Sequence, residues 1–391
     1  MLRRLLPAVL AAAALLPSTA AADTKLTGRA LLPADASWSA PFAGATNTNP
    51  APAPGARQPV GGFSALLDAP GKDTYYAMPD NGFGSKANSR SFLLRVYTVR
   101  LDSRRSGGRG SGAVTILDAI TLRDPDHKLG FPIVTDGTPD RLLTGGDLDI
   151  ESVRRAPDGT LWFGEEFGPF LVHTDATGKV LEAPFPVPGV ISPSSPLLAV
   201  GQTPNLANSN GFEGTALAAD GRTLHPVLEG PVAGDDRRTR RLYTFDLVTK
   251  TWKAGYRTYV VDDPSFLVAD LTLVHKDTFV SLERDNGQGA AAKHKTAYAV
   301  TLAGDGSVRK REVLDELAIP DPFGLSPLDA RPGDIGLGDP FAMPYQTIEA
   351  VLPIRGGRVA IVNDTNFGST GRNPARADDS DFIEVLVPGL R

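Results

Sequence analysis

Residues 145–153 have the sequence GGDLDIESV, and residues 161–168, after a turn, have the sequence LWFGEEFG. The pattern predicts two short strands joined by a turn at Pro157, Asp158 and Gly159. Antiparallel strands return to the edge that they left, so the acids that open the first strand meet those that close the second. These carboxylates are Asp147, Asp149, Glu151, Glu165 and Glu166. A hydrophobic core gains nothing from such a cluster, which therefore indicates a function.

The same pattern occurs four more times along the chain, at residues 61–81, 210–229, 268–285 and 348–364. In each copy one residue marks the start of the first strand and an acid marks the end of the second, 13 to 16 positions later. Only the first copy opens without an acid. The marked pairs are Ser64 and Asp80, Glu151 and Glu165, Glu213 and Glu229, Asp270 and Glu283, and Glu349 and Asp364.

A second, more amphipathic hairpin follows the repeated unit, as in residues 241–246 with 256–260 and residues 297–301 with 308–311. Two hairpins make a four-stranded unit, and four-stranded units repeated around an axis are the blades of a β-propeller. We therefore predict an all-β fold, a β-propeller of five or six four-stranded blades, as a single domain over residues 23–391. The terminal strands near residues 26–32 and 382–387 are expected to pair and to close the ring.

Residues 1–22 have the features of a secretory signal peptide, with Arg3 and Arg4 before a short apolar segment and alanines before Asp23. The chain has no cysteine, so neither a lipoprotein anchor nor a disulfide is expected. No later apolar run is long enough for a membrane anchor. The formal net charge of -5 argues against a nucleic-acid partner. We expect a secreted or periplasmic monomer that acts on a small anionic or ester substrate.

The innermost strand of each propeller blade lines the central channel, so the residues that open these strands converge. Four converging carboxylates cannot all stay ionised unless a cation lies among them. Oxygen ligands without His or Cys favour Ca²⁺, or another hard divalent cation, over zinc. The predicted inner ligands are Glu151, Glu213, Asp270 and Glu349. A wider set would bind a further ion or support the inner ligands, and it comprises Asp80, Glu165 or Glu166, Glu229, Glu283 and Asp364.

Other interpretations of these residues stay open. Acids at strand ends also suit turns and solvated rims. Arg284 lies between two acids, where it would either meet an anionic substrate or neutralise its neighbours. The five histidines show no metal-ligand spacing, and no Gly-x-Ser-x-Gly motif is present, so the sequence does not support serine-histidine catalysis.

Four blocks resemble the bacterial phytase-like family, exported proteins described as having esterase-like activity of the phytase family. They are DLDIES (147–152), WFGEEFGP (162–169), NGFEG (210–214) and LERDN (282–286), in a resemblance that extends from about residue 61 to 364. The resemblance implies a phytase-like propeller and, by a looser kinship, hydrolysis of phosphate esters with calcium. Thr215 and the segment at residues 292–295 depart from the family pattern, and neither touches the acids.

The leading hypothesis is an exported, metal-dependent phosphoesterase with an axial Ca²⁺ site. In it, Glu165 or Glu166 helps to deprotonate a water molecule, and Arg284 offsets charge in the transition state. A lactonase or carboxylic-ester hydrolase on the same metal site is the alternative. A non-catalytic propeller that binds a ligand or partner is the second alternative.

Overall fold

The computed structural model describes residues 24–40 and 57–390 of the 391-residue chain. In this part the regular structure consists of 24 strands and three single-turn 3-10 helices, so the predicted all-β class is confirmed. The predicted signal peptide lies outside the described residues. Within the described ranges, no helix is long and apolar enough to cross a membrane.

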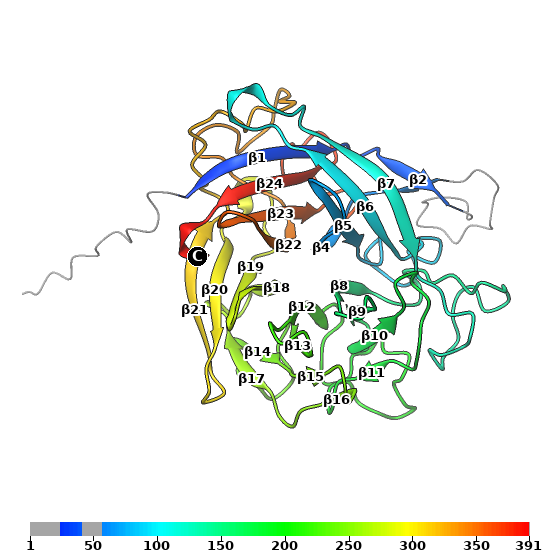
Figure 1. Cartoon of the computed structure of the whole chain (residues 1–391). Helices are drawn as coiled ribbons and strands as arrows, with labels where there is room; N and C mark the ends of the chain where they lie inside the picture. The colour runs from blue at the N-terminus through cyan, green and yellow to red at the C-terminus, as the bar shows by residue number, and fades with distance from the viewer. Residues whose placement is uncertain (1–23, 41–56, 391) are drawn as a thin grey trace, which may run out of the picture.

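Five antiparallel hairpins surround the middle of the molecule (Figure 1). They coincide with the five copies predicted from the sequence. The first strand of each hairpin contacts the first strand of the next, and β22 contacts β4. The hairpins are β4 (Phe63–Asp68) with β5 (Thr74–Pro79), β8 (Ile150–Arg155) with β9 (Leu161–Glu165), β12 (Phe212–Leu217) with β13 (Thr223–Leu228), β18 (Leu267–His275) with β19 (Thr278–Arg284), and β22 (Thr347–Ile354) with β23 (Arg358–Asp364).

Further strands extend each hairpin outward. The outer strands are β6 (Arg95–Asp102), β7 (Ala113–Thr121), β10 (Phe170–Thr174), β11 (Phe185–Pro186), β14 (Thr239–Leu242), β15 (Phe245–Asp246), β16 (Thr251–Trp252), β17 (Arg257–Val260), β20 (Lys295–Leu302), β21 (Val308–Asp315), β24 (Ser380–Leu386) and β1 (Lys25–Leu32). A separate small pair is β2 (Ser37–Ser39) with β3 (Arg57–Pro59), and the 3-10 helices are η2 (Ser106–Gly108), η3 (Gly289–Ala291) and η4 (Pro388–Leu390).

The predicted outer hairpins are present in different degrees. Strands β20 and β21 form the expected hairpin. The one expected at residues 241–246 and 256–260 is divided, because β14 pairs with β17 whereas β15 pairs with β16. The expected pairing of the terminal strands is present, since β1 runs antiparallel to β24. Strand β1 also touches β7 at one bridge, which joins the first and fifth hairpins into one eight-stranded sheet.

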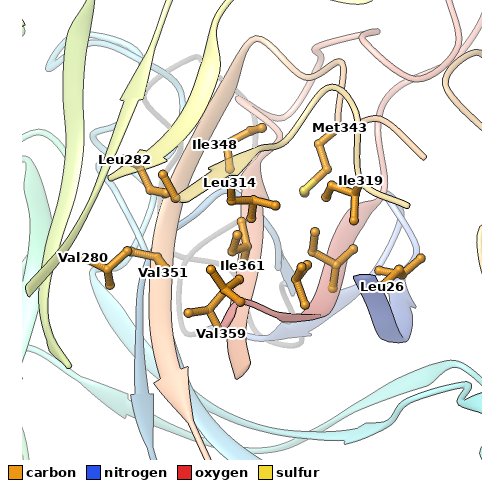
Figure 2. Packing of buried hydrophobic residues seen from close by; sticks show 14 of the residues in the cluster. Leu26, Val280, Leu282, Leu314, Ile319, Met343, Ile348, Val351, Val359 and Ile361 are labelled. Carbon is orange, nitrogen blue, oxygen red and sulfur yellow. The ribbon is translucent and has the colours of Figure 1, made fainter. Parts of the chain in front are cut away.

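The apolar core fills the spaces between neighbouring hairpin units. Figure 2 shows one such cluster, in which Val280 and Leu282 of β19 pack near Val351 of β22 and Ile361 of β23. A second cluster joins β4 to β6 with β8 to β10, and others occupy the spaces between the remaining neighbours. The side chains of the inner strands are therefore held firmly on both faces of each sheet, which positions the residues at their ends. The number of blades stays a prediction.

Candidate metal centre

A β-bulge near the start of the first strand distinguishes all five hairpins. In each one the pairing of the two strands skips a single residue, and such a bulge changes the direction of the side chain that it carries. Three of the skipped residues are glutamates, and all three line a central cavity. The skipped residues, in chain order, are Ser64, Glu151, Glu213, Ala269 and Glu349.

A second position in each hairpin also faces this cavity. It is the residue that follows, along the returning strand, the partner of the residue just before the bulge. The first, second, third and fifth hairpins carry an acid at this position, and the fourth hairpin carries an arginine. These residues are Asp80, Glu166, Glu229, Arg284 and Asp364, and all of them line the cavity.

The cavity has a volume of about 350 Å³ and is lined by eight carboxylates and one guanidinium, all of them buried. The rest of its wall consists mainly of Asn, Gln, Ser and Thr residues. A larger cavity, of about 590 Å³, lies at the turns of the first and fifth hairpins and contains two acids among four basic side chains. The acids of the central cavity are Asp80, Asp149, Glu151, Glu166, Glu213, Glu229, Glu349 and Asp364.

Six of these acids form two compact groups. Asp80, Asp149 and Glu151 make one group, and Glu166, Glu213 and Glu229 make the other, each with carboxylate oxygens within 4.8 Å of one another. One oxygen of Glu151, Oε2, is buried without a hydrogen-bond partner, and the same is true of Oε2 of Glu213. Buried polar atoms are almost always partnered, so these two oxygens point to a ligand that the protein itself does not supply. Each group contains one of them.

The raised pKa values of the cavity acids also indicate a site that would be stabilised by positive charge. Burial raises the pKa of Glu151 well above its usual value, and the neighbouring carboxylates of Glu213 and Asp149 raise it further. Burial likewise raises the pKa of Glu213 well above its usual value, and the charges of Glu229 and Glu349 raise it further. Protein groups alone thus favour the protonated acids. A divalent cation reverses this preference, because it stabilises the ionised carboxylates that bind it.

Arg284 supplies the only basic side chain among the described residues that line this cavity. Its Nη2 lies 2.9 Å from Oε1 of Glu229 and 2.9 Å from Oε1 of Glu349. Its Nη1 donates to Oδ1 of Asn286. Both terminal nitrogens are therefore engaged by protein groups.

Asp270, predicted as an inner ligand, does not line the cavity. Its Oδ1 accepts a hydrogen bond from Nη2 of Arg154 at 2.9 Å, and its Oδ2 accepts one from the backbone N–H of Val351 at 3.0 Å. In the fourth hairpin the bulge falls on Ala269, so Asp270 is one position too far along the strand. A shift of one residue turns a strand side chain to the opposite face.

Two predicted residues of the wider set are likewise directed away from the cavity. Glu165 is buried and accepts hydrogen bonds from the backbone N–H groups of Asp149, Phe167 and Gly168 at 3.1, 3.0 and 2.6 Å. Burial raises its pKa to about 8. Glu283 accepts the hydroxyl hydrogen of Tyr259 and pairs with Lys310. The other predicted ligands line the cavity together with Glu166 and Arg284. They are Asp80, Glu151, Glu213, Glu229, Glu349 and Asp364.

Asp149 is the cavity residue whose role the sequence left unassigned. It lies two positions before Glu151, and Asn81 fixes its carboxylate with a backbone N–H at 3.2 Å and a side-chain amide at 2.7 Å. The alternation of residues along a strand was the available indication, because positions two apart share a face. Asp147, two positions earlier, instead accepts hydrogen bonds from Thr144 and Val134.

One relative is an uncharacterized secreted protein of Arthroderma benhamiae, which is 26% identical over 290 residues. The match covers 56% of this chain and 56% of that protein, so it spans just over half of the relative.

Two solved structures show weaker likeness. The PQQ-bound aldose sugar dehydrogenase of Streptomyces coelicolor matches with 14% identity and a TM-score of 0.40, over 93% of this chain and 98% of that one. An exo-β-1,3-galactanase of Phanerochaete chrysosporium matches with 8% identity and a TM-score of 0.38, over 93% of this chain and 64% of that one.

The sequence model described as "Phytase-like: Esterase-like activity of phytase" matches residues 58–367. The chain belongs to this phytase-like family.

Proposed function

We propose that this protein is a metal-dependent hydrolase of esters, with phosphate esters as the favoured substrates. The observation that carries the proposal is the central cavity, where two groups of three buried carboxylates each contain an oxygen without a partner. Membership of a family described by esterase-like activity supports a hydrolase. A buried concave site with strongly shifted acids is also the expected setting for chemistry.

The donor set fits a hard divalent cation, with Ca²⁺ as our choice. Every candidate ligand is a carboxylate, and Ca²⁺ prefers oxygen ligands in flexible arrangements. Asp80, Asp149 and Glu151 would hold one ion, and Glu166, Glu213 and Glu229 would hold a second. A bound ion of this kind polarises a phosphoryl or carbonyl oxygen and makes water more acidic. We leave Asp270 and Glu283 out of the ligand set, because neither lines the cavity and each is paired with a basic side chain outside it.

Asp364 is our candidate for the group that accepts a proton from water. It lines the cavity but belongs to neither compact group. Burial and the charge of Glu349 raise its pKa to about 7, which suits a general base near neutral pH. The backbone N–H of Asn366, at 2.8 Å, and the hydroxyl of Thr347, at 3.1 Å, hold its carboxylate in place. This role replaces the one expected from the sequence of Glu165 or Glu166.

The test is turnover of a phosphate-monoester panel with and without a chelator. We expect activity that chelation abolishes and that added Ca²⁺ restores, and that Glu213→Gln lowers by roughly 100-fold or more, as loss of a general acid-base or ligand group would. Asp364→Asn should lower kcat while the number of bound ions stays the same. Turnover that persists after chelation and in Glu213→Gln would refute the proposed mechanism.

A carboxylic-ester or lactone substrate is the second candidate, supported by the words "esterase-like" in the family description. The same polarised oxygen would then belong to a carbonyl group. Assays of matched lactone and aryl-ester panels beside the phosphate panel distinguish the two substrate classes.

Two further parts of the proposal concern the whole chain. Export is supported by the pattern in residues 1–22 and by the name of the secreted relative. Five blades are supported by the five hairpins and by the apolar clusters between them.

A further inference from the structure

The fourth hairpin differs from the others at both of the positions that face the cavity. At its bulge it carries Ala269, where the other hairpins carry Ser or Glu. At the end of its returning strand it carries Arg284, where the others carry Asp or Glu. The two positions are 15 or 16 residues apart in all five hairpins, so the equivalence holds through the whole repeat. The fourth hairpin thus gives the cavity a cation and no carboxylate.

The position of this cation is defined by its neighbours. Nη2 of Arg284 lies 2.9 Å from Glu229, which ends the third hairpin, and 2.9 Å from Glu349, at the bulge of the fifth. All three residues are at least 95% buried. A single nitrogen therefore bridges two carboxylates from the hairpins on either side, as a bound metal ion would.

We propose that the guanidinium of Arg284 permanently occupies what would otherwise be a third cation site. The inference rests on the proposed function, because it takes the two compact carboxylate groups to be ion sites. On this view the cavity holds two exchangeable ions and one charge that is part of the chain. Arg284 is then a residue that sets the number of ions rather than a clamp on the substrate. Its two Nη atoms, both engaged by protein groups, agree with that role, whereas its Nε is buried without a hydrogen-bond partner.

The first experiment counts Ca²⁺ per chain after equilibrium dialysis, by elemental analysis, in the wild type, Arg284→Gln and Arg284→Lys. Gln removes the charge but keeps a polar side chain, so we expect one additional ion per chain. Lys keeps the charge, so we expect the wild-type count. A folded Arg284→Gln protein with the wild-type count or fewer would overturn the inference.

The change Glu349→Gln, made in two backgrounds, tests the same site through a carboxylate that Arg284 contacts. In the wild-type background Glu349→Gln should leave the count unchanged, because Glu349 belongs to neither compact group and contacts Arg284 instead. In the Arg284→Gln background the same change should remove the additional ion. If Arg284→Gln does not fold, Glu349→Gln alone decides, and the loss of an ion from it overturns the inference.

The outcomes separate this inference from the proposed function. A wild-type protein that binds no Ca²⁺ or other divalent ion contradicts both. A wild type with two ions and an Arg284→Gln protein with two ions contradicts only the role of Arg284.

Discussion

At the scale of single residues, the site depends on which of two adjacent side chains faces the cavity. Glu166 faces it, whereas Glu165 next to it accepts hydrogen bonds from two backbone N–H groups of the following turn and from that of Asp149. Arg284 faces it, whereas Glu283 next to it pairs with Lys310. Successive residues of a strand point to opposite sides, so neighbours of similar chemistry acquire unrelated roles.

The two adjacent glutamates give a matched pair of variants. Glu166→Gln should weaken Ca²⁺ binding by at least about tenfold, since even the loss of a group that supports a ligand costs that much. Glu165→Gln should leave Ca²⁺ affinity close to the wild type. It should instead lower the free energy of unfolding by about 1–3 kcal/mol. The reason is that Gln has an NH2 group in place of one carboxylate oxygen, and an NH2 group cannot accept the backbone hydrogen bond that this oxygen accepts.

Calorimetric titration with Ca²⁺ and chemical unfolding of both variants provide the check. Equal losses of Ca²⁺ affinity in the two proteins would contradict this assignment of roles.

At the scale of elements, the bulge decides how far the sequence could predict the site. The five hairpins, their turns and the pairing of the terminal strands follow from apolar periodicity and are present. The register of each ladder does not follow from spacing, because one skipped residue changes the direction of every side chain around it. In the fourth hairpin an alanine occupies the bulge and Asp270 stands beside it, so the sequence pattern favours the wrong residue as the one that faces the cavity. The repeat does not predict Asp149, because the other hairpins carry no acid at its position.

Asp270 instead connects three inner strands. It joins β18 to the N–H of Val351 in β22 and to Arg154 in β8, and its side chain is 1% exposed. We predict that Asp270→Ala lowers the free energy of unfolding by about 3–5 kcal/mol, since it leaves the buried charge of Arg154 with neutral acceptors and no carboxylate. The number of bound ions should not change.

Denaturant unfolding and an ion count on the same sample test this prediction. A loss of one ion with little change in stability would restore Asp270 as a ligand.

At the scale of the whole molecule, the five hairpins collect in one cavity a set of acids that none of them holds alone. Hairpins two and three provide the two compact groups, together with Asp80 from hairpin one. Such a concentration of carboxylates opposes folding when they are ionised, because each is buried and repelled by the others. The stability of the whole ring should therefore depend on protons and on cations, which compete for the same oxygens.

This competition predicts how chelation and pH combine. The pKa of Asp364 rises from 3.8 to about 7 on folding, and the pKa values of the other cavity acids rise as well. Between about pH 4 and pH 7 the folded protein thus binds more protons than the unfolded chain, so the metal-free protein loses stability as the pH rises through this window. Bound ions keep the acids ionised and remove this loss. The difference in Tm between Ca²⁺-loaded and chelated protein should accordingly be small near about pH 5 and large near about pH 8, as differential scanning calorimetry would record. A difference that stays constant over this range would show that cations do not bind to these carboxylates.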